Sequence, residues 1–154
     1  MSTLTKTVFA GIFALALPAT ASAMCPSYET SGYGLSYDAE SAYAPQSTQV
    51  IAGGDIDLGE CAELPGYGYV VESPDFTMQY DALGMGRALE LRANASCDAV
   101  LLINTAEGEW LFNDDTNELN PAVRIENAPS GQYDIWVGTL GEENCEAVFE
   151  VETF

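Results

Sequence analysis

Hydrophobic and polar residues alternate along short segments from residue 47 to the C-terminus, which is the pattern of strands with one buried face. Glycine and proline turns separate these segments at short intervals. The expected strands are 48–52, 55–58, 67–72, 75–80, 87–93, 99–104, 109–112, 122–126, 132–138 and 146–152. The side chains expected to face the core are Phe76, Met78, Tyr80, Leu89, Leu91, Ala93, Tyr133, Ile135, Val137, Phe149 and Val151. Many short strands at this spacing predict an all-β sandwich or barrel.

One segment breaks the alternation, because Val100, Leu101, Leu102 and Ile103 are apolar on both faces. Such a run predicts a central strand, or a strand whose outer face is covered by the N-terminal part of the chain. No stretch longer than about ten residues keeps a helical period without glycine or proline. A second domain is therefore not indicated, and residues 47–154 are expected to form one domain.

The N-terminal residues 1–23 have the features of a signal peptide. Lys6 supplies the positive charge, 8–17 is apolar, and Ala21 and Ala23 form a small-x-small cleavage site. The apolar stretch is shorter than the roughly 20 residues that span a bilayer. We expect a periplasmic or secreted protein with no membrane insertion after cleavage; an uncleaved anchor and lipidation at Cys25 are the alternatives. Residues 24–46, rich in Tyr, Ser, Gly and Pro, are expected to form an irregular arm.

The strong excess of acidic residues excludes several classes of function. The chain has 24 acidic residues, four basic residues and no histidine, and only three arginines remain after residue 23. Such a chain is repelled by nucleic acid and by anionic membranes. Without histidine or lysine in the mature chain, Ser-His, Cys-His and Ser-Lys pairs cannot form, so we expect no enzyme. Paired carboxylates of the glycosidase type stay open on residue counts alone. The acidity itself favours either solubility or cation binding.

The four cysteines, Cys25, Cys61, Cys97 and Cys145, are even in number and lie in a chain expected to be exported. This pattern predicts two disulfides, and the absence of a CxxC pair and of histidine argues against zinc. Three connectivities are possible. We prefer Cys25–Cys61, which would tie the arm to the domain, and Cys97–Cys145, which would join the starts of two predicted strands.

The C-terminal part carries a recognisable order of motifs. An aspartate leads the apolar strand at 98–103, a glycine turn follows at Gly108, an Asn-Asp-Asp loop at 113–115, and a Gly-x-Tyr strand at 131–133. This order resembles the bacterial pre-peptidase C-terminal domain, with a family-like core at 75–154. The resemblance implies a small jelly-roll-like antiparallel β-sandwich, here of about 8–10 short strands. It also implies a non-catalytic module that is usually appended to exported proteases, sometimes binds calcium, and aids substrate binding, secretion or maturation.

Two surface features are candidate sites. The loop 113–120 is the densest oxygen cluster of the chain, and calcium prefers such oxygen ligands. The candidate calcium ligands are Asp98, Asn113, Asp114, Asp115 and Glu118. The alternative is a turn whose Asp and Asn side chains bind their own backbone. Trp136 alternates with Ile135 and Val137, so it is either an exposed aromatic binding surface or a core residue.

These observations predict a non-catalytic, exported β-sandwich that acts as a binding or accessory module, with calcium as a candidate stabilising ion. Its partner would be an unidentified protein or a polysaccharide, met by the loops at 114–120 and 142–144. Two alternatives are an accessory or maturation module for secreted peptidases, and a structural surface or matrix protein.

Overall fold

Two β-sheets pack face to face in the computed structural model, which describes residues 24–154; the predicted signal peptide lies outside the described residues. The first sheet has the order β1 (Tyr33–Asp38), β5 (Phe76–Asp81), β10 (Gly131–Thr139), β7 (Ala99–Asn104) and β8 (Trp110–Asn113). The pairing of β5 with β10 ends partway along β10. Further along β10, β4 (Tyr69–Val70) pairs with it on the same side, and β3 (Ile56–Asp57) pairs with β4. The second sheet has the order β2 (Gln46–Ala52), β11 (Cys145–Thr153), β6 (Leu89–Ala95) and β9 (Ala122–Ile125).

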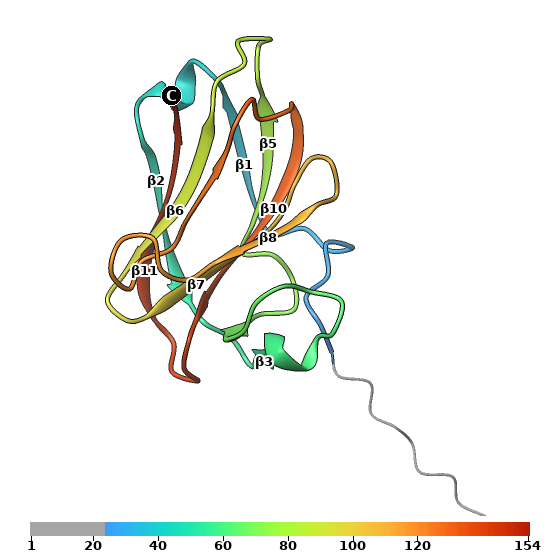
Figure 1. The fold of residues 1–154 in the computed structure, drawn as a ribbon, viewed down its shortest axis with the longest axis vertical. Coiled ribbons are helices and arrows are strands. Elements are labelled where there is room, and N and C mark those ends of the chain that lie inside the picture. Colours follow the sequence, from blue (N-terminus) through green and yellow to red (C-terminus); the bar gives the residue numbers. More distant parts are fainter. Residues whose placement is uncertain (1–23) are drawn as a thin grey trace, which may run out of the picture.

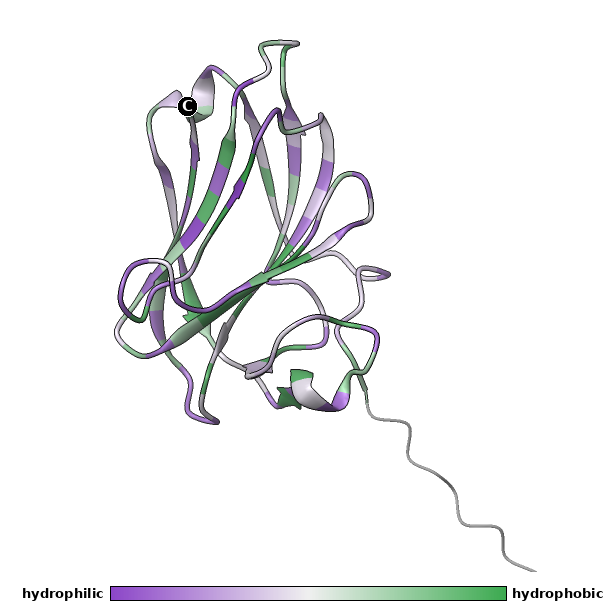
Figure 2. Cartoon of the chain, in the orientation of Figure 1, coloured by the Kyte–Doolittle hydropathy of each residue, from purple (hydrophilic) through white to green (hydrophobic). Residues whose placement is uncertain are grey.

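The alternation in the sequence places the main core between these sheets. Figure 2 shows hydrophobic and hydrophilic residues alternating along strands such as β6. All eleven side chains predicted to face the core are buried. Phe76 of the first sheet stacks on Phe149 of the second, with ring centroids 4.9 Å apart, and Tyr80 meets Tyr133 edge to face at 6.2 Å. The Phe76–Phe149 contact joins the two layers into the predicted all-β sandwich, whereas Tyr80 and Tyr133 both belong to the first sheet (Figure 1).

A second, smaller core lies on the outer face of β7 and β10. Val100, Leu102 and Trp136 point away from the main core and are fully buried. They are covered by the segment between β2 and β5, which contains β3, the 3₁₀ helix η2 (Leu58–Glu60) and β4; this segment contributes Ile56, Leu58, Cys61 and Val70. The apolar run Val100–Ile103 therefore belongs to a central strand, and its outer face is also covered by another part of the chain.

The predicted irregular arm at 24–46 is wrong in its central part. Residues Tyr33–Asp38 form β1, which pairs in parallel with all of β5 and is the one parallel pair in an otherwise antiparallel architecture among residues 24–154. A 3₁₀ helix, η1 (Ser41–Tyr43), follows it and leads into β2. The reason is that β1 is held mainly by its backbone: only Leu35 in it is buried, so it has little hydrophobic signal in the sequence.

The prediction of Trp136 as an exposed binding surface is also wrong. Trp136 has no exposed surface, lies 5.3 Å from Trp110 between ring centroids, and donates its indole N–H to the Glu72 carbonyl at 3.4 Å. In the register of β10 and β7 it stands opposite Leu102, so the segment that covers Leu102 also covers Trp136. Both faces of β10 are buried, and alternation alone cannot reveal this.

The four cysteines form the preferred pairs, Cys25–Cys61 and Cys97–Cys145, with Cα atoms 5.8 and 6.2 Å apart. The first ties the N-terminal segment to the covering segment of the second core. The second ties the β6–β7 turn to the start of β11. Disulfides persist in oxidising compartments, so they indicate an extracytoplasmic protein. Within residues 24–154, no helix is long and apolar enough to cross a membrane.

Candidate functional site

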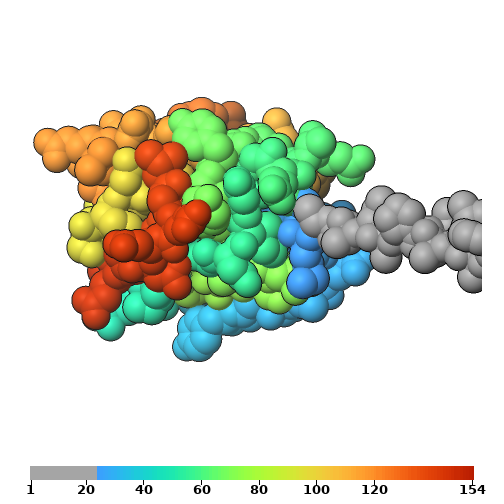
Figure 3. Space-filling model, turned by 90° about the horizontal axis from the view of Figure 1, so that it is seen from below, coloured from blue at the N-terminus to red at the C-terminus, as the bar shows by residue number. Residues whose placement is uncertain are grey.

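Acidic and tyrosine residues gather at one end of the sandwich, and the connections that carry them lie in the lower part of Figure 1. The connections β3–β4, β6–β7, β8–β9 and β10–β11 meet there, and the view from below in Figure 3 shows these parts of the chain side by side. Their side chains include Asp98, Asp114, Asp115 and Glu142, with Tyr67 and Tyr69 among them. We call this set of six residues the acidic end.

Tyr67 is fixed in this set although its side chain is 48% exposed. Its hydroxyl donates a hydrogen bond to the Asp114 carboxylate, and its ring packs on Phe112 with centroids 5.3 Å apart. Gly66, at φ +95°, allows this approach, because a Cβ at this position would overlap the Phe112 ring. The hydrogen bond to Asp114 and the neighbouring negative charges raise the pKa of Tyr67. The phenol therefore stays protonated and keeps its orientation.

A second tyrosine–carboxylate pair joins β4 to the β10–β11 hairpin. The Tyr69 hydroxyl donates to Glu142 at 3.4 Å. Partial burial, followed by the charge of Glu142, raises the pKa of Tyr69. The hairpin itself is closed by a hydrogen bond of 2.6 Å from the Thr139 hydroxyl to the Gly141 carbonyl. The acidic end is thus tied together across connections that are far apart in the sequence.

The β8–β9 loop is held by its own polar side chains. The Asn113 amide oxygen accepts hydrogen bonds from the Thr116 hydroxyl at 2.8 Å and from the Ala122 N–H at 3.0 Å. Asn117 and Asn120 exchange backbone hydrogen bonds, and the Asn120 side chain accepts from the Ala95 N–H. Donors of the chain itself therefore occupy several of the oxygens that a cation would use.

The predicted calcium ligands come together only in part. Asp98, Asp114 and Asp115 are close enough that, after partial burial, the charges of Asp115 and Asp114 raise the pKa of Asp98. Asn113 is engaged within the loop, and Glu118, at φ +57°, lies exposed at the loop tip. In residues 24–154, no group of three or more His, Cys, Asp or Glu side chains has the geometry to hold a metal ion. Calcium binding stays a prediction.

The thermal midpoint in excess calcium and in EDTA tests this prediction. A calcium ion bound only to the folded state would raise the midpoint, and the rise would grow with the logarithm of the calcium concentration above the Kd. We expect the rise to disappear in the Asp114→Asn, Asp115→Asn double variant, with Glu40→Gln as the control for a lost surface charge. Equal midpoints of the unsubstituted chain in calcium and in EDTA would rule the site out.

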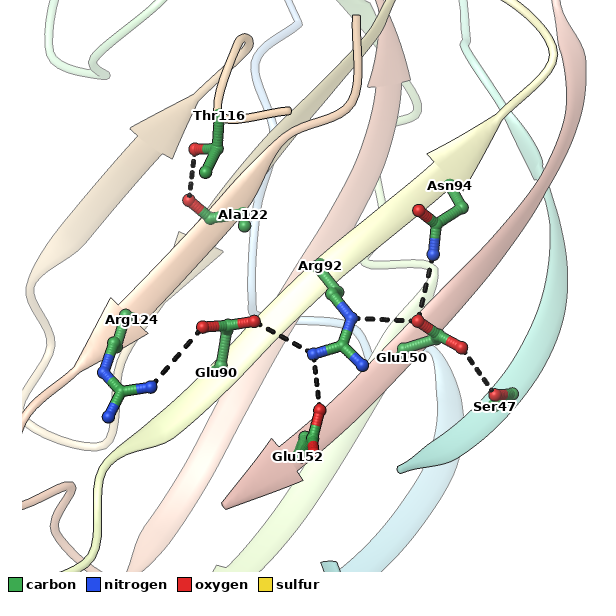
Figure 4. A network of polar contacts seen from close by, with 9 residues as sticks. All are labelled: Ser47, Glu90, Arg92, Asn94, Thr116, Ala122, Arg124, Glu150 and Glu152. Carbon is green, nitrogen blue, oxygen red and sulfur yellow. Dashed lines mark hydrogen bonds and ion pairs between the residues drawn. The ribbon is translucent and has the colours of Figure 1, made fainter. Parts of the chain in front are cut away.

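Positive charge lies elsewhere on the molecule. On the outer face of the second sheet, Arg92 forms ion pairs with Glu90, Glu150 and Glu152 at 2.7–2.9 Å (Figure 4). Arg124 forms ion pairs with Glu90 and Glu126. The guanidinium of Arg87 lies over the Tyr43 ring, 4.6 Å from its centroid. Residues 24–154 contain only these three basic side chains, so the carboxylates of the acidic end have no cationic partner there.

A different carboxylate, Asp75, replaces a missing strand partner of β10. The pairing of β10 with β5 ends at Ile135, and β4 pairs with β10 at Thr139. In the gap, the Val137 N–H donates to Asp75 Oδ2 at 2.8 Å, and the Val137 carbonyl accepts from the Gly53 N–H. Burial of the carboxylate raises the pKa of Asp75 to about 7, and the hydrogen bond from Val137 offsets only part of this effect.

The raised pKa of Asp75 makes stability depend on pH. The folded state keeps the proton of the Asp75 carboxyl up to about pH 7, whereas the unfolded chain releases it near the ordinary pKa of 3.8. The stability that Asp75 contributes is therefore fully present below pH 3.8 and is lost as the pH rises to about 7. The loss is on the order of 2–4 kcal/mol. Asp75→Asn keeps an acceptor for Val137 and removes the titration. We expect urea unfolding at pH 4.5, 6 and 8 to show a smaller loss of stability with pH for this variant. Equal pH slopes for Asp75→Asn and for the exposed-site control Glu29→Gln would contradict the assignment.

Sequence reasoning missed Tyr67, Tyr69 and Asp75. The hydrogen bonds of the two tyrosines reach carboxylates 47 and 73 positions away, and no periodicity connects such distant residues. Asp75 stands directly after Ser73-Pro74, where it reads as an ordinary turn residue. The only local signal was Pro65-Gly66, which marks the turn that presents Tyr67.

No protein-family model and no curated protein sequence matches the chain. Among solved structures, it is similar to the pre-peptidase C-terminal domain of collagenase from Bacillus anthracis, with a TM-score of 0.45 and 9% identity over 79% of this chain and 96% of that chain. It is also similar to a periplasmic inhibitor of g-type lysozyme from Aeromonas hydrophila, with a TM-score of 0.40 and 11% identity over 80% of this chain and 99% of that chain. The first of these structures is a domain of the family that the sequence motifs resemble.

Proposed function

We propose that this protein is a non-catalytic, exported binding module whose acidic end takes a basic surface of a partner protein. The observation that carries the proposal is the combination of carboxylates with the exposed Tyr67 and the half-buried Tyr69, held in place by hydrogen bonds, with no basic side chain among them. Tyrosine is enriched at protein interfaces, since it offers a large contact area and a polar tip with few rotatable bonds.

Charge gives this surface its specificity. A partner with lysine or arginine side chains is attracted to the acidic end, while acidic proteins, nucleic acid and anionic membranes are repelled. Because the Asp114 and Glu142 carboxylates are already oriented by Tyr67 and Tyr69, less ordering entropy is lost on binding. The sandwich and its two disulfides hold the loops in one arrangement.

The experiment is a capture of proteins from the periplasm and the culture medium on three immobilised forms of the chain. The first is the unsubstituted protein. The second carries Asp114→Asn, Asp115→Asn and Glu142→Gln at the acidic end. The third is the control, in which the exposed residues Glu29, Glu40 and Glu107 are changed to glutamine, so it loses the same charge from other surfaces.

We expect basic proteins to be retained by the first and third forms, and affinity for the second to fall by roughly 10- to 100-fold. The retained complex should dissociate as salt rises, because exposed charge pairs are screened. Equal retention by the second and third forms would contradict the proposal.

The same preparation separates the alternatives. A secreted peptidase among the captured proteins would indicate the accessory or maturation role. Binding to insoluble polysaccharide, unaffected by the acidic-end substitutions, would favour a polysaccharide partner, and no binding at all would favour a structural role. Purified protein is expected to leave casein uncleaved.

A further inference from the structure

The edge strand β2 offers backbone groups with no partner among residues 24–154. It pairs only with β11. Ala88 and Phe154 exchange both of their backbone hydrogen bonds. Because hydrogen-bonded pairs alternate along an antiparallel ladder, the even-numbered residues of β11 direct their N–H and C=O groups to β6, and the odd-numbered residues direct theirs to β2. The even-numbered residues of β2 therefore bond to β11. Ser47, Gln49 and Ile51 direct their N–H and C=O groups to the open edge.

This edge lacks the features that normally protect an edge strand. Such strands are usually short, charged, bulged or interrupted by proline. β2 has seven residues, no charged side chain, no proline and a continuous register with β11. By contrast, the edge strands β8 and β9 have four residues each, and β9 carries Arg124.

A groove of about 310 Å³ runs along the open side of β2. It lies between β2 and the other sheet, and is lined by Thr48, Gln49 and Val50 of β2 and by Tyr33, Asp75 and Phe76 opposite. Thr48 and Val50 alternate with the outward-facing residues of β2 and so point between the sheets, yet they are only half-buried because this side of the sandwich is open.

Asp75 places a carboxyl group beside the groove, and this group is negatively charged above about pH 7. Its Oδ2 atom accepts a hydrogen bond from Val137, its Oδ1 atom makes none, and the residue lines the groove. No arginine lines this groove. A second hollow, of about 570 Å³, lies on the opposite face of the same strand and includes Ile51, Asn94 and Glu146.

We propose that β2 receives an extended segment of a partner protein as an added strand, with a lysine or arginine side chain of that segment in the groove beside Asp75. Backbone hydrogen bonds to Ser47, Gln49 and Ile51 supply the attachment, and the alternating side chains enter the hollows on either face. A second copy of this chain is disfavoured, because its own β2 has no basic side chain to offer Asp75 and both copies are strongly acidic. This site is separate from the acidic end and does not depend on it.

The test is made at pH 8, where Asp75 is ionised, with the purified exported protein and a blocked heptapeptide that alternates valine and threonine around one central lysine. Amide chemical shifts and hydrogen exchange report where the peptide binds. We expect protection of the amides of Ser47, Gln49 and Ile51. Gln49→Pro should abolish binding, since proline removes an outward N–H without breaking a bond to β11. Gln49→Thr is the matched control and should bind as the unsubstituted protein does.

Asp75→Asn keeps the hydrogen bond to Val137 and should weaken the lysine peptide about fivefold or more. A peptide with glutamate in place of lysine should not bind. Equal binding of the two peptides, shifts confined to the acidic end, or β2 amides protected by self-association without peptide would each overturn the proposal. The acidic-end triple variant should still bind the peptide, so failure of the proposed function and failure of this site are distinguishable.

Discussion

Replacing Trp136 with alanine is expected to lower the free energy of unfolding by about 3–5 kcal/mol, which corresponds to a fall of roughly 10–20 °C in the thermal midpoint. Trp136 is fully buried in the second core, where it contacts the Trp110 ring and lies among side chains from the covering segment. Alanine leaves a large cavity that this disulfide-tethered segment cannot close. Thermal unfolding followed by circular dichroism measures the effect.

Tyr28→Ala is the matched control, because Tyr28 also packs on Trp110, at 6.0 Å between centroids, but is 55% exposed. Its midpoint should stay within a few degrees of the unsubstituted protein. Trp136→Phe should lower the thermal midpoint by an intermediate amount. If the alanine variant does not fold, this variant can still be compared with Tyr28→Ala. An unchanged midpoint for Trp136→Ala would mean that the covering segment does not pack on β10.

Removing the Cys97–Cys145 disulfide by a double alanine substitution is expected to cost about 4 kcal/mol. The bond closes a loop of 48 positions that contains β7, β8, β9 and β10. Without it, the unfolded chain regains the freedom of that whole loop, and the folded state loses the tie between the β6–β7 turn and β11. Urea unfolding under oxidising conditions measures the loss.

The other disulfide supplies the comparison. Removing Cys25–Cys61 opens a loop of 36 positions and should cost slightly less. It should also leave the main core intact, because Cys25 and Cys61 pack in the second core. Stability that is unchanged in the Cys97, Cys145 double variant would contradict a stabilising role for that bond.

Alternation predicted the strands well because most of them bury one face. All ten expected strands are present, from β2 to β11, since segments such as 87–93 and 146–152 show the two-residue period clearly. β1 was missed because its place depends on a parallel backbone pairing with β5, with Leu35 as its only buried side chain. A pairing that consists mainly of backbone hydrogen bonds leaves almost no pattern in the side chains.

The site was predictable only in part, because it depends on contacts between distant segments. The acidity of the loop at 113–120 indicated Asp114 and Asp115, and the expected position of Asp98 at the end of a neighbouring strand added Asp98. The orientation of the carboxylates comes from Tyr67 and Tyr69, which reach the site only once β3 and β4 fold back beside β10. The same folding-back buries Trp136. The run at 100–103, apolar on both faces, was the one local sign of this cover.

Chemical cross-linking of the captured partner shows whether the acidic end is the surface that binds it. A carbodiimide joins carboxylates to lysine amines in contact, and residues 24–154 contain no lysine, so every lysine in a cross-link comes from the partner. We predict that the linked carboxylates, identified by mass spectrometry, are those of Asp98, Asp114, Asp115 and Glu142. Links confined to Glu29, Glu40 and Glu107, with the four carboxylates of the acidic end unmodified by the partner, would contradict the account.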